Sequence, residues 1–417
     1  MRFAIAVATI LTACALAIPA GAAPGIRYGV QDDAWLTHGP GTLDGRLDEL
    51  DRLGVDLVRF NLHWNTIETV EGEPDWAASD DVLQGLRARG IAAVVGIVGT
   101  PRWANGRRPP NYAPRRAADV AAFARAAARR YRWVRDWLVW NEPNQRRWLT
   151  PTSPALYVAR ILNPAYAAIH SVNRRARVAG GVTAPRANLG GVSPVDWIRG
   201  MRRAGARLDV YAHHPHPARP SDSPFAGRGG CARCSTITMA TLERLLREVR
   251  RAWGTGKRIW LTEYAYQTNP PDRIAGVSQA RQARLLADAA LRAYRAPRVD
   301  MLVHYLVRDE PTLARWQSGL YTFAGRPKPA ARAYPLPLTV AGRSAGGAVL
   351  WGMVRPRTGP QPYRLQARKP GGGWSWLGPN RRTSAHGFLS RRVRLPRGTL
   401  VRVWSPRDEA YSLPVAV

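Results

Sequence analysis

The sequence predicts an α/β fold, namely a (β/α)8 TIM barrel followed by a small C-terminal β-sandwich. Apolar strand-like runs alternate with helical patterns over most of the chain, which is typical of a parallel sheet wrapped by helices. After Pro329 the pattern changes to short runs separated by turn residues, which indicates a second, all-β module. With 417 residues, of which 45% are hydrophobic, the chain can hold one barrel of about 250 to 300 residues and a smaller domain.

Eight apolar runs are candidates for the barrel strands. The run at 92–98 is almost continuously apolar, as expected for an inner strand that is buried on both faces. The predicted barrel strands are 27–30, 57–62, 92–98, 137–140, 178–182, 208–213, 258–263 and 301–306, and the clearest helices are 43–53, 117–131 and 154–171. The predicted strands of the second module are 347–354, 363–367, 374–377, 388–395 and 400–404. We therefore expect the barrel at 23–333 and the sandwich at 334–417.

Two glutamates each stand at the end of a predicted strand. Glu142 follows the run 137–140 in the sequence Trp-Asn-Glu-Pro, and Glu263 ends the run 258–263. Either glutamate alone could merely cap a following helix. Two strand-end carboxylates on one barrel, however, are what retaining glycoside hydrolysis needs, one to protonate the leaving oxygen and one to attack the anomeric carbon.

These residues resemble the motifs of glycoside hydrolase clan A, the retaining barrels whose acid/base glutamate follows an asparagine on strand 4 and whose nucleophile ends strand 7. Within the clan, the stretch 131–144, the Pro-Lys-Pro-Ala sequence at 327–330 and the extra C-terminal domain are most similar to family 39 and its exopolysaccharide-hydrolase relatives, with family 5 second. The resemblance covers roughly residues 27–335. It implies that Glu142 is the acid/base and Glu263 the nucleophile.

The resemblance also assigns roles to neighbours of the pair. Arg59 matches the clan arginine that keeps the nucleophile ionised, and apolar residues flank it on both sides in a predicted buried strand. Asn141 matches the asparagine that hydrogen-bonds the sugar 2-hydroxyl. His214 matches a histidine beside the catalytic pair. His216 stands where the family has a tyrosine that hydrogen-bonds the nucleophile, so we expect the proton affinity of the nucleophile to be set differently here.

Aromatic residues near the strand ends are candidates for sugar contacts, because sugars present apolar C–H faces. Strand 8 carries an aromatic platform in the family, for which we choose Tyr305, with Asp309 as a possible sugar ligand. Five further aromatic residues follow predicted strand ends, namely Trp64, Trp103, Trp148, Tyr264 and Tyr266. Among these, Trp64 and Trp148 are the first candidates for substrate binding.

The chain is strongly basic, with 62 Lys and Arg against 29 Asp and Glu, a net charge of +33. The predicted sandwich contributes 14 Lys and Arg against only Asp408 and Glu409. Such a surface suits an anionic polymer or cell wall, to which the C-terminal domain could hold the protein. A merely solvated basic face is the alternative. Nucleic acid is disfavoured, because the chain carries no recognised binding motif and has an export signal.

The N-terminal residues have the pattern of a secretory signal, with Met1-Arg2, an apolar stretch and small residues that predict cleavage near Ala22. The alternative is a lipoprotein signal at 11–14, which would leave the protein lipid-anchored through Cys14. No other run in the sequence is long enough to span a bilayer.

In an exported chain Cys231 and Cys234 are expected to close a small surface disulfide. A zinc site that joins them to the histidines at 213, 214 and 216 is the alternative. The intervening loop shows no usual zinc spacing, so we predict neither a metal nor another cofactor.

We therefore predict a secreted retaining glycoside hydrolase that cleaves O-glycosidic bonds of a polysaccharide or oligosaccharide by double displacement. Endo action is favoured because the similar family includes exopolysaccharide hydrolases. The alternatives are an exo-acting β-xylosidase-like enzyme and a non-catalytic carbohydrate- or cell-wall-binding protein on the same barrel. A distance of about 5 Å between the two carboxyl groups would support retention, whereas one of about 9 Å would favour inversion.

Overall fold

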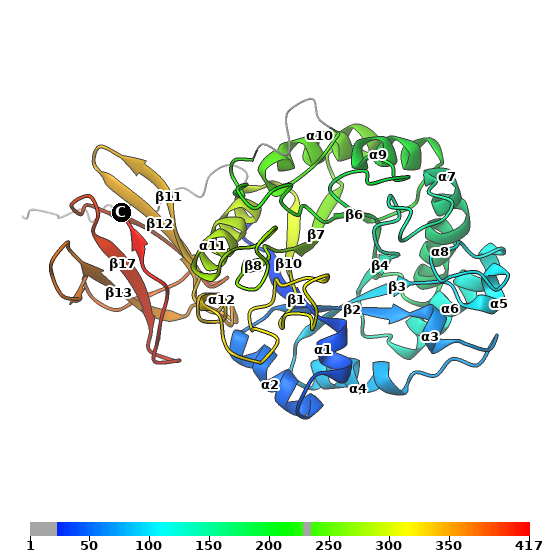
Figure 1. The fold of residues 1–417 in the computed structure, drawn as a ribbon, viewed down its shortest axis with the longest axis horizontal. Helices are drawn as coiled ribbons and strands as arrows, with labels where there is room; N and C mark the ends of the chain where they lie inside the picture. Colours follow the sequence, from blue (N-terminus) through cyan, green and yellow to red (C-terminus); the bar gives the residue numbers. More distant parts are fainter. Residues whose placement is uncertain (1–22, 228–234) are drawn as a thin grey trace, which may run out of the picture.

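Eight parallel strands close into a barrel in the computed structural model, which describes residues 23–227 and 235–417 (Figure 1). The strands pair in the order β1-β10-β7-β6-β5-β4-β3-β2, so the predicted α/β barrel is confirmed. The barrel strands are β1 Arg27–Gln31, β2 Leu57–His63, β3 Ala92–Val98, β4 Asp136–Val139, β5 Arg177–Thr183, β6 Val210–His213, β7 Arg258–Tyr264 and β10 Val299–Tyr305. Within the described ranges, no helix is long and apolar enough to cross a membrane.

Helices surround the barrel and cover its outer face (Figure 1). They are α1 Asp33–His38, α2 Leu43–Leu53, α3 Trp64–Ile67, α4 Ala77–Ala88, α5 Arg102–Asn105, α6 Ala117–Arg130, α7 Pro154–Tyr157, α8 Asn163–Val172, α9 Pro194–Arg203, α10 Leu242–Trp253, α11 Gln279–Arg295 and α12 Pro329–Ala333. Helix α2 shows why the bounds fall where they do. The Thr42 hydroxyl accepts from the amide of Gly45 at its start, and Gly54 ends it in the left-handed conformation at φ 63°.

The helix predicted at 154–171 is interrupted in the structure. Residues Val158–Leu162 form a π-helical turn between α7 and α8. Pro164 has no backbone N–H, so it cannot donate the α-helical hydrogen bond to Arg160, and the wider turn accommodates this loss. The prediction of one continuous helix was therefore wrong, although its face of buried residues is in place.

Two apolar layers hold the barrel together. Inside it, Leu57, Val94, Leu138 and Met301 are among the buried side chains that fill the interior. Between strands and helices lies a larger cluster with Leu47, Leu86 and other helix residues. The interior is thus a packed core, as is usual for this fold, and the open space for a ligand lies at the mouth of the barrel.

Antiparallel sheets follow the barrel, as the sequence predicts. One sheet contains β11 Leu338–Ser344, β12 Gly347–Met353 and β16 Phe388–Val393. The other contains β13 Pro362–Arg368, β14 Ser375–Trp376, β15 Arg381–Arg382, β17 Leu400–Ser405, β18 Ala410–Tyr411 and β19 Val415–Ala416. Strand β11 was missed in the sequence, because only its first residues are buried. A two-stranded ribbon, β8 Thr268–Asn269 and β9 Val277–Ser278, was also not predicted.

The C-terminal sheets pack against the barrel beside α11 and α12 (Figure 1). The rings of Trp351 and Phe388 lie 5.4 and 4.7 Å from the ring of Tyr294 on α11. Arg357 forms an ion pair of 2.5 Å with Asp56 of the barrel. The two parts therefore share apolar surface rather than being joined only by a linker.

Several predictions concern residues outside the described ranges. The secretory signal at 1–22, the alternative lipid anchor at Cys14 and the disulfide between Cys231 and Cys234 all lie there. These remain predictions.

Candidate active site

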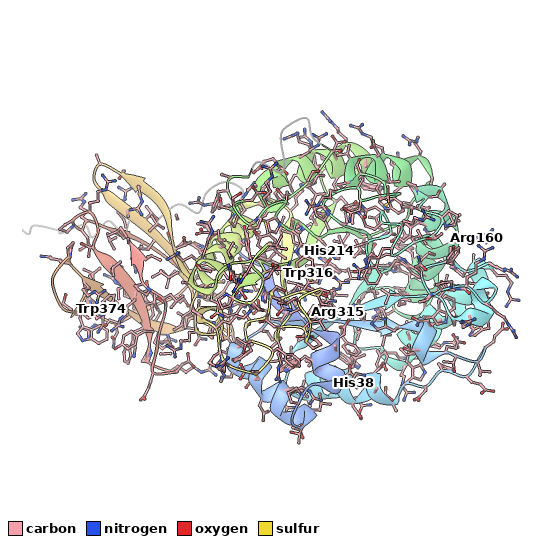
Figure 2. The ribbon with its side chains drawn as sticks, viewed as in Figure 1. His38, Arg160, His214, Arg315, Trp316 and Trp374 are labelled. Atoms are coloured by element: carbon pink, nitrogen blue, oxygen red, sulfur yellow. The ribbon has the colours of Figure 1, made fainter. Side chains whose placement is uncertain are left out.

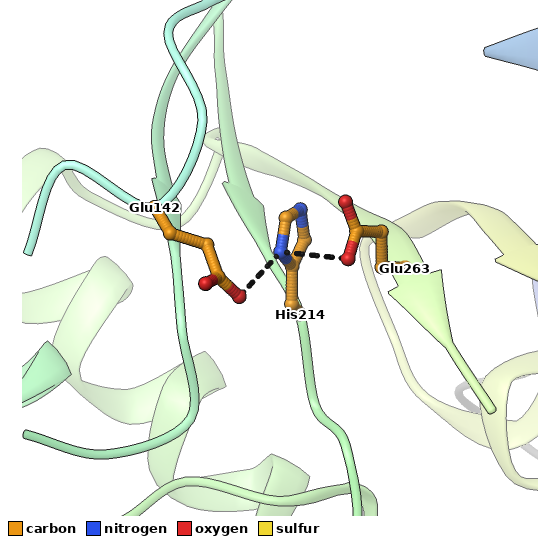
Figure 3. Close-up of side chains that lie close together, drawn as sticks. All are labelled: Glu142, His214 and Glu263. Atoms are coloured by element: carbon orange, nitrogen blue, oxygen red, sulfur yellow. Dashed lines mark hydrogen bonds and ion pairs between the residues drawn. The ribbon is translucent and has the colours of Figure 1, made fainter. Parts of the chain in front are cut away.

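Glu142 and Glu263 flank His214 at the mouth of the barrel (Figure 3). Glu142 follows β4, His214 follows β6 and Glu263 belongs to β7, so the carboxyl ends of three strands bring them together. Nδ1 of His214 lies 3.0 Å from Oε1 of Glu142 and 3.5 Å from Oε2 of Glu263. The two carboxylates and the imidazole all present atoms within 4.8 Å of one another. One carboxylate oxygen of Glu142 and one of Glu263 therefore lie within 4.8 Å of each other, which fits the spacing of about 5 Å for retention better than the about 6.5 to 9.5 Å for inversion.

Arg59 is completely buried and contacts His214 and Glu263 of this group as well as Asn141. Its Nη1 donates to Oε1 of Glu263 at 2.8 Å, and its Nη2 donates to Oδ1 of Asn141 at 2.7 Å. Because Asn141 accepts with its oxygen, its amide nitrogen is left to face the cleft that the residue lines. Arg59 thus orients Asn141 and holds the carboxylate of Glu263 in place.

The hydrogen bonds around His214 determine its tautomer. Nη1 of Arg59 lies 3.0 Å from Nε2 of the ring, and a guanidinium can only donate, so Nε2 accepts. Burial lowers the pKa of His214 well below its usual value; Glu263 opposes this effect, whereas Arg59 adds to it. The ring is therefore neutral, and its single proton sits on Nδ1, which donates toward the carboxylates.

The two glutamates differ in their proton affinity. Burial raises the pKa of Glu142 above the usual value, and the cations nearby, among them Arg59 and Arg147, only partly oppose it. Burial also acts upward on Glu263, but there the contacts with His214, Arg59 and His216 outweigh it and lower the pKa. Glu142 thus favours the protonated form and Glu263 the ionised form, the division of labour between an acid and a nucleophile.

His216 contacts the same carboxylate as Arg59 does. Its Nε2 lies 3.4 Å from Oε2 of Glu263, and its ring lies 4.8 Å from the ring of Trp316 and 6.3 Å from that of Tyr305. The histidine therefore stands where the family pattern has a tyrosine and keeps a contact with the nucleophile position.

The backbone around Glu142 is strained. Trp140, Glu142 and Val182 have φ angles of 76°, 40° and 43°, in the left-handed region that disfavours residues other than glycine. The amide of Glu142 donates to the carbonyl of Val182 at 2.9 Å, which ties the end of β4 to the end of β5. Strain of this kind persists where the surroundings fix it, and here it aims the Glu142 side chain into the mouth.

The pair opens into a cleft of about 850 Å³. Trp148, Tyr305 and Trp316 line it together with His216, so it offers several aromatic surfaces beside the polar groups. Trp316 packs on His216, whose ring lies 6.3 Å from that of His214; Trp316 and His214 are labelled in Figure 2. Trp316 was not predicted, because it lies in the irregular segment after β10, where no periodic pattern marks its direction. Its position in the loop after the last barrel strand was the one available signal.

Trp64 does not contact the cleft, so its prediction as a substrate-binding residue is wrong. Its side chain is completely buried, stacks at 5.6 Å on Phe123 and donates from Nε1 to Oε2 of Glu68 at 2.6 Å. Trp103 packs edge-on against it at 5.9 Å. The end of β2 turns this indole under helix α6, where its area contributes to the core.

Asp309, Tyr264 and Tyr266 also lie away from the cleft. Asp309 is buried and forms an ion pair of 2.7 Å with Lys328 of the Pro-Lys-Pro-Ala sequence, so it is not a sugar ligand. Tyr264 donates to the hydroxyl of Tyr266 at 2.9 Å, and both rings are buried. These residues hold the segments around β7 and β10 instead of facing a ligand.

Glu142, His214 and Glu263 also form a possible metal-binding group by residue type and distance. Their hydrogen bonds do not fit a metal, however. A metal on Nδ1 of His214 would force the ring proton onto Nε2, where Nη1 of Arg59 already donates from 3.0 Å. The cation at Arg59 would also repel a second cation at this place.

No protein-family profile matches the sequence, and no curated protein has significant sequence similarity to it. Solved structures with a similar fold include a family 39 glycoside hydrolase from Bacteroides cellulosilyticus WH2, with TM-score 0.59, 18% identity and coverage of 89% of this chain and 80% of that one. A glucosidase from Croceicoccus marinus has TM-score 0.59, 13% identity and coverage of 93% and 96%. GH5_18 from Streptomyces cattleya has TM-score 0.52, 18% identity and coverage of 74% and 79%.

At these identities the likeness establishes the fold. The expected resemblance to glycoside hydrolases of families 39 and 5 is therefore confirmed at the level of the fold. What the individual site residues do is not decided by the likeness, so their roles rest on the geometry above.

Proposed function

We propose that this protein is a secreted retaining glycoside hydrolase that cleaves a polysaccharide or oligosaccharide by double displacement. One observation carries the proposal. One carboxylate oxygen of Glu142 lies within 4.8 Å of one of Glu263 at the barrel mouth, and the surroundings of the two glutamates shift their pKa values in opposite directions. The glycosidases among proteins of similar fold support the same activity.

The reaction follows from the state of each carboxyl group. Ionised Glu263 attacks the anomeric carbon while Glu142 gives its proton to the leaving oxygen, so the glycosidic bond breaks as the glycosyl-enzyme ester forms. Glu142, now ionised, then takes a proton from water, whose oxygen attacks the same carbon and releases Glu263. His214 donates from Nδ1 toward both carboxylates, and Asn141 presents its amide N–H groups to the sugar.

The shape of the cleft supports endo action. Lining residues come from loops after strands on both sides of the mouth, from Asp33 after β1 to Arg186 after β5. Sugar units therefore have room on either side of the catalytic pair, as internal cleavage of a chain requires. An exo-acting β-xylosidase-like enzyme would release single terminal sugars instead.

Hydrolysis of a panel of defined oligosaccharides and polysaccharides tests this function. We expect short oligosaccharides as the first products from a polymer, with the anomeric configuration of the substrate retained in early NMR spectra. Release of monosaccharide only would favour the exo-acting alternative. Binding without any hydrolysis would favour the non-catalytic protein.

The C-terminal domain carries a surface that fits the proposed anchoring to an anionic polymer. Arg364 lies over the ring of Trp376 at 4.2 Å, and Arg402 lies over that of Trp374 at 4.1 Å. Among the described residues, neither arginine forms an ion pair with a carboxylate. Trp374 lies far from the catalytic group, so this surface is separate from the cleft (Figure 2). Anionic polysaccharide could therefore bind here without blocking the reaction.

Charge variants test the anchor better than a deletion of the domain, because deletion would expose the apolar surface shared with α11. Arg364→Gln with Arg402→Gln should weaken retention on an anionic polysaccharide, and added salt should weaken it further. The control removes two exposed arginines from the outer helices, Arg129→Gln with Arg250→Gln. Equal retention in both variants would contradict the anchor.

A further inference from the structure

The cleft is electrostatically asymmetric. Arg146, Arg147 and Arg186 line it from the loops after β4 and β5. Asp32 and Asp33 line it from the start of α1, which follows β1. Because the barrel closes in the order β1-β10-β7-β6-β5-β4-β3-β2, these two sets of loops lie on opposite sides of the mouth. A substrate that spans the mouth therefore meets cationic groups at one end and acidic groups at the other.

The three arginines have no carboxylate partner among the described residues. Arg186 donates only to the carbonyls of Ala218 and Pro217, at 3.3 and 3.4 Å. The two remaining segments, 1–22 and 228–234, contain no Asp or Glu at all. On the opposite side, by contrast, Arg315 has Glu310 at 3.7 Å. Arg146, Arg147 and Arg186, here called the cationic wall, therefore keep their guanidinium charges free of ion pairs within the described residues.

Buried amides hold the arginine-bearing loops together. Asn144 accepts from the amide of Ala184 at 2.8 Å and donates to the carbonyl of Val192 at 3.0 Å. Gln145 donates to the carbonyl of Arg186 and accepts from the amide of Asn188 at 3.3 Å. Both amide side chains are buried. The loop after β4 is therefore fixed to the loop after β5, so the cationic wall is preorganised.

The proposed roles of Glu142 and Glu263 indicate which part of a substrate lies beside the cationic wall. The nucleophile approaches the anomeric carbon from the side opposite the leaving oxygen, and Glu142 must reach that oxygen to protonate it. The leaving sugar therefore lies on the side of Glu142, where the arginines stand. Arg147 is near enough to act on the charge of Glu142.

We propose that the enzyme prefers substrates whose leaving-group sugar bears an anionic substituent, bound by Arg146, Arg147 and Arg186. This inference rests on the proposed glycosidase function and extends it to a substrate class. A uronate carboxylate and a sulfate ester both offer oxygens that accept from guanidinium N–H groups. The neutral sugar in the other half of the substrate faces Asp33 and Asn61. The amide of Asn61 donates to the carboxylate of Asp33 at 2.7 Å.

Matched oligosaccharides test the proposal. Each neutral oligosaccharide is compared with its uronate-bearing and its sulfated counterpart of the same linkage, with the anionic sugar on the leaving side. We expect kcat/KM for at least one anionic counterpart to exceed that for the neutral one by about tenfold, which corresponds to about 1.4 kcal/mol. The two anionic arms distinguish a carboxylate from a sulfate ester.

Variants test whether the arginines of the cationic wall cause the preference for anionic substrates. In Arg147→Gln with Arg186→Gln the ratio of anionic to neutral kcat/KM should fall toward one, whereas in Arg129→Gln on the outer helix α6 it should not change. Equal kcat/KM for neutral and anionic members, or a preference that survives in the double variant, would overturn the proposal and leave the glycosidase function intact. No hydrolysis of any member would overturn the glycosidase function and this proposal with it.

Discussion

The end of β4 and the end of β7 carry the same side chain in different surroundings. At β4, Glu142 has His214 as its hydrogen-bond donor, at 3.0 Å, and burial dominates its pKa. At β7, Glu263 accepts directly from Arg59 at 2.8 Å and has His214 and His216 within 3.5 Å. Together, these three contacts outweigh the effect of burial and lower the pKa of Glu263. In the proposed mechanism, these different neighbours make one carboxylate the acid and the other the nucleophile.

Removing each carboxylate should have the largest effect and should separate the two roles. Glu263→Gln should lower kcat by about 10⁴-fold or more on every substrate, because no other group can form the ester. Glu142→Gln should be as damaging on natural glycosides but much less so on substrates with an activated phenol leaving group, which need no proton. Steady-state kinetics on both substrate types measure this.

Azide gives a sharper control for the first step. In Glu142→Ala, added azide should restore turnover of the activated substrate and give a glycosyl azide of retained configuration. Full activity of either Gln variant, or rescue of a Glu263 variant with retention, would contradict the assigned roles.

The two tryptophans that look alike in the sequence should respond differently. Trp64→Ala removes a fully buried ring and should cost about 3 to 5 kcal/mol of unfolding free energy. Trp148→Ala removes a ring that lines the cleft and should raise KM about tenfold with a much smaller loss of stability. Chemical denaturation and kinetics measure the two effects. An unchanged KM in Trp148→Ala would remove this residue from the binding site.

Substitution of His216 should have a smaller effect, on the pH dependence of activity through Glu263 of β7. Glu263 must be ionised to attack, and its pKa lies below the usual value, so activity is lost as pH falls through that lowered pKa. His216→Phe removes a contact that lowers the pKa, and the acidic limb of kcat/KM should therefore move to higher pH by about half a pH unit to one pH unit. His216→Tyr restores a donor and should move it less.

The basic limb of the pH profile of kcat/KM should depend on Glu142, which follows β4. Glu142 must be protonated in the first step, and its pKa is raised, so activity should persist above the usual glutamate range and fall as pH rises through the raised value. His216 also lowers the pKa of Glu142, so His216→Phe should move this limb to higher pH as well. Movement of either limb to lower pH in His216→Phe would contradict this role of the imidazole.

Chelation should have the smallest effect. The Nδ1 proton of His214 and the guanidinium of Arg59 at Nε2 leave the imidazole no free lone pair for a cation, and the charge of Arg59 disfavours a second cation between the glutamates. Activity should therefore be unchanged after treatment with a chelator and after dialysis. Stoichiometric zinc in the purified protein, or loss of activity that zinc restores, would contradict this.

The sequence predicted most accurately the positions of residues at the ends of barrel strands. Glu142, Glu263 and Arg59 lie on barrel strands or directly after them, and the parallel sheet brings such positions to one face whatever the loops do. The prediction that Trp64 binds substrate was wrong. A residue just past a strand can turn into the core or toward the cleft, and the sequence pattern is the same for both.

The loops carry what the sequence could not predict. Trp316 and Arg186 line the cleft from irregular segments whose course depends on distant partners, such as the amide of Gln145 that holds the Arg186 loop. The same reason explains Asp309, whose buried partner Lys328 lies in a separate segment. The charge of an arginine also did not predict its surroundings. Arg59 is buried in an ion pair with Glu263, Arg402 lies over the ring of Trp374, and Arg147 lines the cleft.

Trapping of the covalent intermediate tests the central claim most directly. The protein is incubated with an activated 2-deoxy-2-fluoro derivative of a sugar that it hydrolyses, and the labelled peptide is mapped by mass spectrometry. The account predicts one glycosyl group per chain, attached to Glu263, and no label in Glu263→Gln. A label on another residue, or turnover of the natural substrate with inverted configuration and no trapped ester, would contradict it.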